Sequence, residues 1–268
     1  MLDSNSGAVS ASSTAAEKKQ VIYLADYRPS NYLIESTSLV FDLYDEKTIV
    51  SNTMVMQRNA AADDFSSLSL HGENLRLMSL SIDGVELEQG AYTLTDRGLT
   101  IQSPKQRFVL TIKTEIDPKA NLSFEGLYLS DGMYCTQCEA EGFRKITYYL
   151  DRPDVMSIFD VEIIASKQRY PVLLSNGNNM GSGDLDEGRH WVKWQDPHKK
   201  PCYLFALVAG DLQVVEDDFR TMSGRDVKLQ IFVEAKDLDK CDHAMRSLKN
   251  AMVWDEQVYG REYDLDLY

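Results

Sequence analysis

The sequence predicts a mainly β fold that is built around an N-terminal β-sandwich. From Asn31 onward the dominant hydrophobic period is two, as expected for strands that bury one face. Turn signals separate these runs, and no segment before residue 210 carries the pattern of a helix of three turns. Many short strands with no helices between them are typical of a sandwich and not of a βαβ fold.

The expected strands follow one another along the chain. The alternation over 39–44 and the run over 48–57 predict the first two. Asp83-Gly84 between the runs 80–82 and 85–87 is the signature of a type I′ hairpin turn. Gly98 likewise separates the run 92–95 from the run 99–101. Further strands are expected over 108–116, 160–165, 172–175, 190–194 and 202–208.

The pattern changes after Gly210-Asp211. A strand pair is expected over 212–217 and 227–234, with its bend near Ser223-Gly224-Arg225. One helix should follow, beginning at Asp237 or Asp239 and ending near Gly260. The apolar stripe of this helix, which we expect to be core packing, consists of Cys241, Met245, Leu248 and Met252. Residues 263–268 alternate apolar and acidic side chains, which predicts the beginning of another strand.

These patterns predict three parts: a disordered tail over 1–20, a β-sandwich domain over 21–211, and the start of a second domain over 212–268. A strand needs neighbours, and a helix face needs a surface to cover. We therefore expect the second domain to be truncated at Tyr268. The stripe around Met245, Leu248 and Met252 would then lie uncovered and favour self-association of the chain.

Composition narrows the classes of function. The chain has 268 residues, of which 43% are apolar, so it can build a core without disulfides or a structural metal. Its formal charge of -14 argues against nucleic-acid binding and against an anionic membrane surface. No window approaches 18 consecutive apolar residues, and the first twenty residues lack the apolar core of a secretory signal. We expect a cytoplasmic protein without a membrane partner.

A single CxxC motif lies at Cys135-Thr-Gln-Cys138. A structural zinc site needs two further ligands at a comparable spacing, but the other cysteines, Cys202 and Cys241, lie 39 positions apart. A thioredoxin-like redox site would place the motif at the start of a helix in a βαβ unit. The β-rich surroundings favour two small, half-buried residues, and a CxxC redox protein remains as an alternative.

Acidic side chains surround the second cysteine. If 135–141 is extended, Gln137, Glu139 and Glu141 share one face of the strand. Two carboxylates and an amide on one face repel one another unless they are solvated or matched by a cation. The pattern indicates either a solvated edge or a site for a positively charged group.

The sequence contains no recognisable catalytic motif. The four histidines form no i, i+4 pair, and neither a GxSxG elbow nor a phosphate-binding Gly-rich loop is present. His190 and His198 flank two tryptophans, and we interpret them as polar positions on a strand and on its following turn.

Several longer strings resemble one known family. These strings are CTQCEAEG at 135–142, ITYYLDRPD at 146–154, LSNG at 174–177, WQDP at 194–197 and PCYLFALVAGD at 201–211. In them the chain resembles the N-terminal region of the bacterial aminopeptidase N family, whose members are zinc-dependent gluzincin aminopeptidases. The resemblance runs in consistent order from about Tyr27 to Tyr268.

This resemblance implies a β-sandwich that leads, near Gly210-Asp211, into a thermolysin-like catalytic domain. It implies that the chain is truncated before the GAMEN and HExxH motifs. The complete enzyme would then use zinc to remove N-terminal amino acids, whereas this chain would hold no metal and be inactive. The implied partners are peptides with a free N-terminus and the remainder of the catalytic domain.

The resemblance also implies roles for individual residues. By the family pattern, the 135–142 loop reaches the active site, where Gln137 and Glu139 contact the N-terminal residue of the substrate. A carboxylate aimed at an α-ammonium makes a strong, charge-assisted hydrogen bond. Glu141, Cys135 and Cys138 are expected to shape the loop. The alternative is a non-catalytic binding or scaffold protein that reuses the same sandwich.

Overall fold

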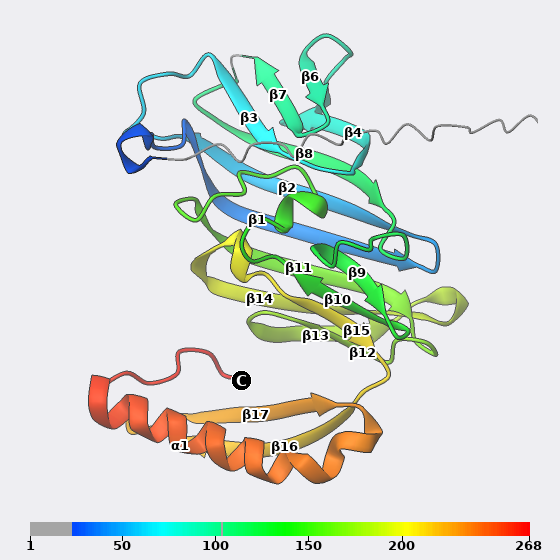
Figure 1. The fold of residues 1–268 in the computed structure, drawn as a ribbon, viewed down its shortest axis with the longest axis vertical. Helices are drawn as coiled ribbons and strands as arrows, with labels where there is room; N and C mark the ends of the chain where they lie inside the picture. Colours follow the sequence, from blue (N-terminus) through cyan, green and yellow to red (C-terminus); the bar gives the residue numbers. More distant parts are fainter. Residues whose placement is uncertain (1–22, 103) are drawn as a thin grey trace, which may run out of the picture.

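A computed structural model describes residues 23–102 and 104–268, so the tail expected over 1–20 lies outside the described residues. Its main feature is an eight-stranded sheet of order β13-β14-β11-β1-β2-β8-β4-β5 (Figure 1). Strands β1 and β11 run parallel, and the other neighbours pair antiparallel. In this order the strands are Asn178–Asp184, Arg189–Pro201, Met156–Ser166, Tyr32–Tyr44, Lys47–Arg58, Arg107–Ile116, Arg76–Ile82 and Val85–Glu86.

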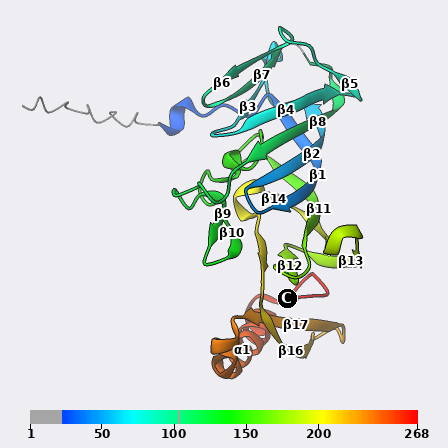
Figure 2. The ribbon, with the colours of Figure 1, turned by 90° about the vertical axis from the view of Figure 1, so that its right-hand side faces the viewer.

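Two smaller sheets cover one side of the large sheet (Figures 1 and 2). One has the order β12-β15-β10-β9 and the other β3-β7-β6. The first comprises Val172–Ser175, Leu207–Gly210, Met133–Gln137 and Gly126–Ser130, and the second comprises Ser67–His71, Gly98–Gln102 and Tyr92–Thr95. A single cluster of buried apolar side chains joins all three sheets. The predicted β-sandwich is confirmed.

Local sequence explains most of these strands. Leu39, Phe41 and Leu43 of β1 are 0%, 0% and 2% exposed, so the period-two pattern does mark the buried face. Asp83 and Gly84 both have positive φ, at 51° and 78°, as a type I′ turn requires. The hairpin between β4 and β5 therefore forms where the sequence predicts it.

The C-terminal part packs a helix on a hairpin. Strands β16 (Gln213–Arg220) and β17 (Asp226–Val233) are followed by a 3-10 helix η5 (Ala235–Lys240) and by α1 (Cys241–Tyr259). Gly260 ends the helix with φ 62°, and its N–H donates to the carbonyl of Glu256. Within the described parts of the chain, no helix combines the length and apolarity of a membrane span.

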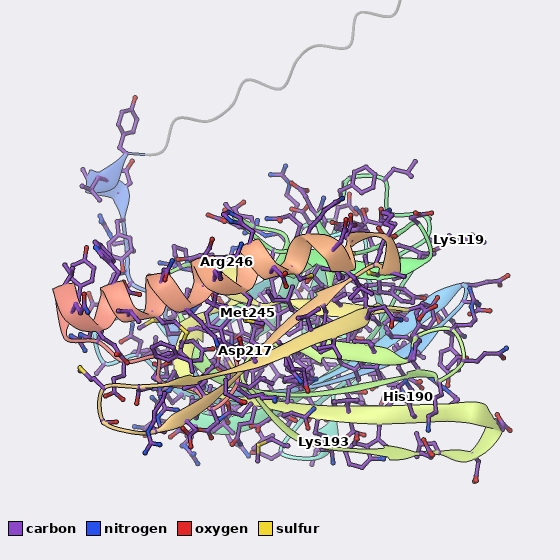
Figure 3. The ribbon with its side chains drawn as sticks, turned by 90° about the horizontal axis from the view of Figure 1, so that it is seen from below. Lys119, His190, Lys193, Asp217, Met245 and Arg246 are labelled. Carbon is purple, nitrogen blue, oxygen red and sulfur yellow. The ribbon has the colours of Figure 1, made fainter. Side chains whose placement is uncertain are left out.

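The apolar stripe of α1 packs in a core, as expected, so the expectation that it lies uncovered is wrong. Met245 and Met252 are 6% and 7% exposed and pack in a second cluster with Val227 and Leu229 of β17. Figure 3 shows α1 lying along the hairpin, and Lys249 pairs with Asp217 of β16 at 2.5 Å. The hairpin and Tyr263 together cover the stripe. Self-association of the chain stays a prediction, without this surface to support it.

Two expected strands are wrong in extent. Over 202–208, Cys202–Leu204 forms a 3-10 turn, and only Leu207–Gly210 is a strand. An apolar run is compatible with a buried turn as well as with a strand, because burial alone does not set the backbone direction.

Residues 263–268 form a single parallel bridge from Leu267 to Lys228 of β17, and not a full strand. The guanidinium of Arg225 donates to the backbone carbonyls of Tyr263 and Leu265. These two carbonyls are therefore not available to pair with a neighbouring strand.

Four strands fall outside the expected runs, namely β3, β9, β10 and β13. Strand β13 reads NNMGSGD and carries little apolar pattern, because it lies at the edge of the large sheet. The hairpin of β9 and β10 positions the candidate site.

Candidate functional site

The loop that follows β10 turns sharply instead of staying extended. Strand β10 ends at Gln137, and the N–H of Gly142 donates to the carbonyl of Cys138 at 2.8 Å. The expectation that Gln137, Glu139 and Glu141 share one strand face is therefore wrong beyond Gln137. A glycine permits the turn, since a Cβ at position 142 would lie 2.3 Å from the Gln137 carbonyl oxygen. The peptide bond between Glu139 and Ala140 is cis.

Buried side chains hold both ends of this loop, which we call the 138–142 loop. Cys138 is 2% exposed, and Phe143, which begins the 3-10 helix η2 (Phe143–Lys145), is fully buried. The Phe143 ring packs edge-on against Tyr149 and Phe205, with centroids 4.8 and 5.3 Å apart. Between these anchors the side chain of Glu139 is exposed. The loop is thus an exposed turn on a rigid base.

The structure brings the two sequence-predicted site residues together. The Gln137 side-chain amide donates to the backbone carbonyl of Glu139 at 3.0 Å. No cationic side chain within 23–102 or 104–268 lies within 4.0 Å of the Glu139 carboxylate. Glu139 therefore presents a negative charge that no described residue matches.

Glu141 is in a different situation from Glu139. Its carboxylate lies 3.2 Å from Arg144, three positions further along the chain, while the side chain remains 70% exposed. A carboxylate that already faces a guanidinium is a weaker acceptor for a second cation than a free one. Of the two glutamates, Glu139 is the one disposed to bind a positively charged group.

A buried ion pair beneath the loop was not predicted from the sequence. The Arg144 Nε lies 2.9 Å from the carboxylate of Asp151, whose side chain is 2% exposed. The same carboxylate oxygen accepts the backbone N–H of Arg144 at 3.1 Å. The spacing of Glu141 and Arg144 by three positions is the one signal that could have pointed to this cluster.

The cysteines around the loop are free thiols. Burial raises the pKa of Cys135 and of Cys138, and it also raises the pKa of Cys202, whose thiol donates to Asp151 at 3.1 Å. Redox-active CxxC motifs depend on the opposite shift, because the thiolate is the reactive form. Cys138 is buried and the motif lies at the end of a strand, not at the start of a helix, so the CxxC redox alternative has no support here.

Thiol labelling tests this assignment. In the native chain at pH 8, we expect Cys138 and Cys202 to resist iodoacetamide, because each unit of raised pKa lowers the thiolate fraction about tenfold. Cys135, which is half-buried, should react sooner, and all the thiols should react in guanidinium. Mass spectrometry of tryptic peptides measures the rates. If Cys138 is labelled as fast in the native chain as in the unfolded chain, the CxxC redox alternative would again be supported.

The histidines and the other potential ligands form no metal site in the described residues. No group of three or more His, Cys, Asp or Glu side chains that could hold a metal ion occurs there. His190 is buried with its Nε2 2.8 Å from the Tyr170 carbonyl, and the exposed His198 lies 3.5 Å from Asp264. Both lie on β14, so the turn expected at His198 is wrong. The side chains that the structure describes therefore do not assemble a set of ligands that fits a zinc ion.

Comparison with known proteins gives a consistent family. The model of the Peptidase M1 N-terminal domain matches residues 28–204. The chain is 52% identical to Aminopeptidase N of Caulobacter vibrioides and 50% identical to that of Escherichia coli, over 93% and 94% of its length. It spans 28% of the length of each of these relatives.

A solved structure agrees with this match. The crystal structure of Legionella pneumophila aminopeptidase A in complex with aspartic acid superposes with a TM-score of 0.87 at 35% identity. The match covers 91% of this chain and 29% of that one. From the three-sheet sandwich, the 138–142 loop and these matches, we conclude that the chain belongs to the Peptidase M1 N-terminal domain family.

Proposed function

We propose that this chain is the N-terminal part of an aminopeptidase and that Glu139 binds the α-ammonium of the substrate. The observation that carries the proposal is the exposed, unmatched carboxylate of Glu139 on a loop whose two ends are buried. A rigid base matters, because a binding group must be held in place before the substrate arrives.

The chemistry of the loop suits an N-terminal residue. An α-amino group has a pKa of about 8, so it is largely cationic near neutral pH. A carboxylate that accepts a hydrogen bond from it forms a short, charge-assisted contact. The side-chain N–H of Gln137 holds the backbone carbonyl of Glu139. The oxygen of the same side-chain amide can serve as a second acceptor for the ammonium. A group that holds the N-terminus at a fixed distance from the scissile bond makes the enzyme an exopeptidase.

The relatives support the reaction class. Two proteins at least 50% identical to this chain are aminopeptidases by name, and the solved relative was crystallised with aspartic acid, an amino acid with a free α-amino group. In the complete enzyme, zinc would polarise the scissile carbonyl and activate water, held by residues outside this chain. We also propose that residues 212–268 begin the catalytic domain and that the enzyme is cytoplasmic.

Matched substrates test the proposal on the complete protein. We expect hydrolysis of aminoacyl-arylamides and at least about 100-fold lower kcat/KM for their N-acetyl counterparts, which lack the ammonium but keep the scissile bond. Equal turnover of the two substrates would contradict the α-ammonium contact. Absence of any hydrolysis, with retained peptide binding, would favour the scaffold alternative.

The isolated 268-residue chain provides the control. We expect it neither to bind zinc at stoichiometric level, measured by elemental analysis after dialysis, nor to hydrolyse the same arylamides. Chelator-sensitive turnover by homogeneous isolated chain would show that these residues suffice, and it would overturn this expectation.

A further inference from the structure

We propose that Arg144, held by Asp151, is the positioning residue that keeps the 138–142 loop in its binding geometry. This inference rests on the proposed function, because it concerns how Glu139 is presented to the substrate. Arg144 itself touches neither Gln137 nor Glu139 through any hydrogen bond or ion pair among the described residues.

Asp151 fixes the guanidinium from below. Its carboxylate is 2% exposed and accepts both the backbone N–H and the Nε of Arg144, at 3.1 and 2.9 Å. The Asp151 carbonyl also accepts from Nη2 of Arg144 at 3.2 Å. The other carboxylate oxygen takes the thiol of Cys202, and the Asp151 N–H donates to His71. Contacts with Cys202 and His71 thus limit the movement of this pair.

The remaining nitrogen of Arg144 reaches the loop. Its Nη1 lies 3.2 Å from Glu141 and 3.9 Å from Glu73, while the Arg144 side chain is 13% exposed. One guanidinium therefore links the buried carboxylate of Asp151 to a carboxylate on the loop itself. Only a planar fork can make these contacts together, so lysine cannot replace arginine here.

The link also separates the two glutamates of the loop. Arg144 matches the charge of Glu141 and leaves the carboxylate of Glu139 free for a substrate. Without Arg144, Glu141 would become a second unmatched anion two positions away. It would compete for the same ammonium, and the loop could pivot between Cys138 and Phe143. A misplacement of about 1 Å can cost about 100-fold in rate.

A double-mutant cycle in the complete enzyme tests the role. We expect Arg144→Lys to lower kcat/KM for aminoacyl-arylamides between about tenfold and 100-fold. In the Glu139→Gln background the same substitution should lower it less than about threefold, because Arg144 acts through Glu139. A substitution that merely weakened the fold would reduce activity by the same factor in both backgrounds, so additivity would overturn the proposal.

A charge-neutral pair guards against failure to fold. Arg144→Met with Asp151→Asn removes both charges. The single side-chain oxygen of asparagine can still accept the backbone N–H at position 144, and its amide NH2 then faces the Cys202 sulfur, which is a weak acceptor. Replacing both partners of a buried pair is tolerated better than removing one. This variant should unfold at the wild-type temperature and should show the same loss of kcat/KM, which again depends on Glu139. An unchanged kcat/KM in this variant would overturn the proposal. If Glu139→Gln alone has no effect, the proposed function fails instead.

Discussion

Glu139→Gln in the complete enzyme is expected to lower kcat/KM by about ten- to 100-fold. The substitution keeps the size of the side chain but removes the charge that faces the substrate ammonium. A hydrogen bond to a charged group contributes about 1.5–3 kcal/mol, which corresponds to this range of rates. Steady-state kinetics on an aminoacyl-arylamide measure it. Thermal stability should not change, because the Glu139 side chain is exposed and makes no ion pair among the described residues.

A matched variant separates the contact from the general charge of the protein. Glu46→Gln makes the same change in net charge in the exposed turn between β1 and β2, and kcat/KM should stay at the wild-type value. Unchanged kcat/KM in Glu139→Gln, with the fold intact, would remove Glu139 from the binding site.

Gly142→Ala is expected to destabilise the fold by about 1–3 kcal/mol, the usual cost of overpacking. The added Cβ would lie 2.3 Å from the Gln137 carbonyl oxygen, 2.9 Å from the Gly126 nitrogen and 3.1 Å from the Cys138 Cα. All three neighbours are backbone atoms, so the hairpin or the loop must move. Denaturant unfolding of the 268-residue chain measures the loss, and kcat/KM of the complete enzyme should fall with it.

Gly210→Ala is the control in the neighbouring strand β15. Its Cβ would meet the Met133 side chain at 2.8 Å, and a flexible side chain can move aside. Both glycines have φ outside the left-handed range, so alanine can adopt the backbone conformation at either position, and only the contacts of the added Cβ differ. We expect the smaller loss of stability at position 210. If Gly142→Ala lowers the free energy of unfolding no more than Gly210→Ala does, the close backbone packing at position 142 does not require glycine.

Much of the sandwich could be predicted from alternation. The buried faces of β1, β2 and β8 and the turn at Asp83-Gly84 follow from local sequence, because a period of two and a pair of positive φ angles are local properties. The edge strand β13 could not be predicted, since it buries few apolar residues.

The sequence singles out the residues of the candidate site, whose roles stay a prediction, but it does not predict the shape of the loop that carries them. Gln137 and Glu139 stand in a string that resembles the family, and the structure does bring the Gln137 side chain to the Glu139 backbone. The turn after Gln137 depends on backbone atoms of Gly142 and Gly126 that pack closely, which no periodicity describes. The partner of Arg144 lies seven positions further along the chain, beyond the reach of helix or strand spacing.

The sequence by itself determined the β class, the change of pattern near Gly210-Asp211 and the residues that carry the proposed binding chemistry, because each depends on local pattern or on a matching string. The tertiary structure alone decided which glutamate is free, what covers the helix stripe and what lies beneath the loop. These depend on contacts that the local sequence pattern does not specify. Arg144 forms ion pairs with Glu141 and Asp151, and the β16–β17 hairpin packs on Met245 and Met252. Charge matching and burial are properties of neighbours in space, so the chain order does not reveal them.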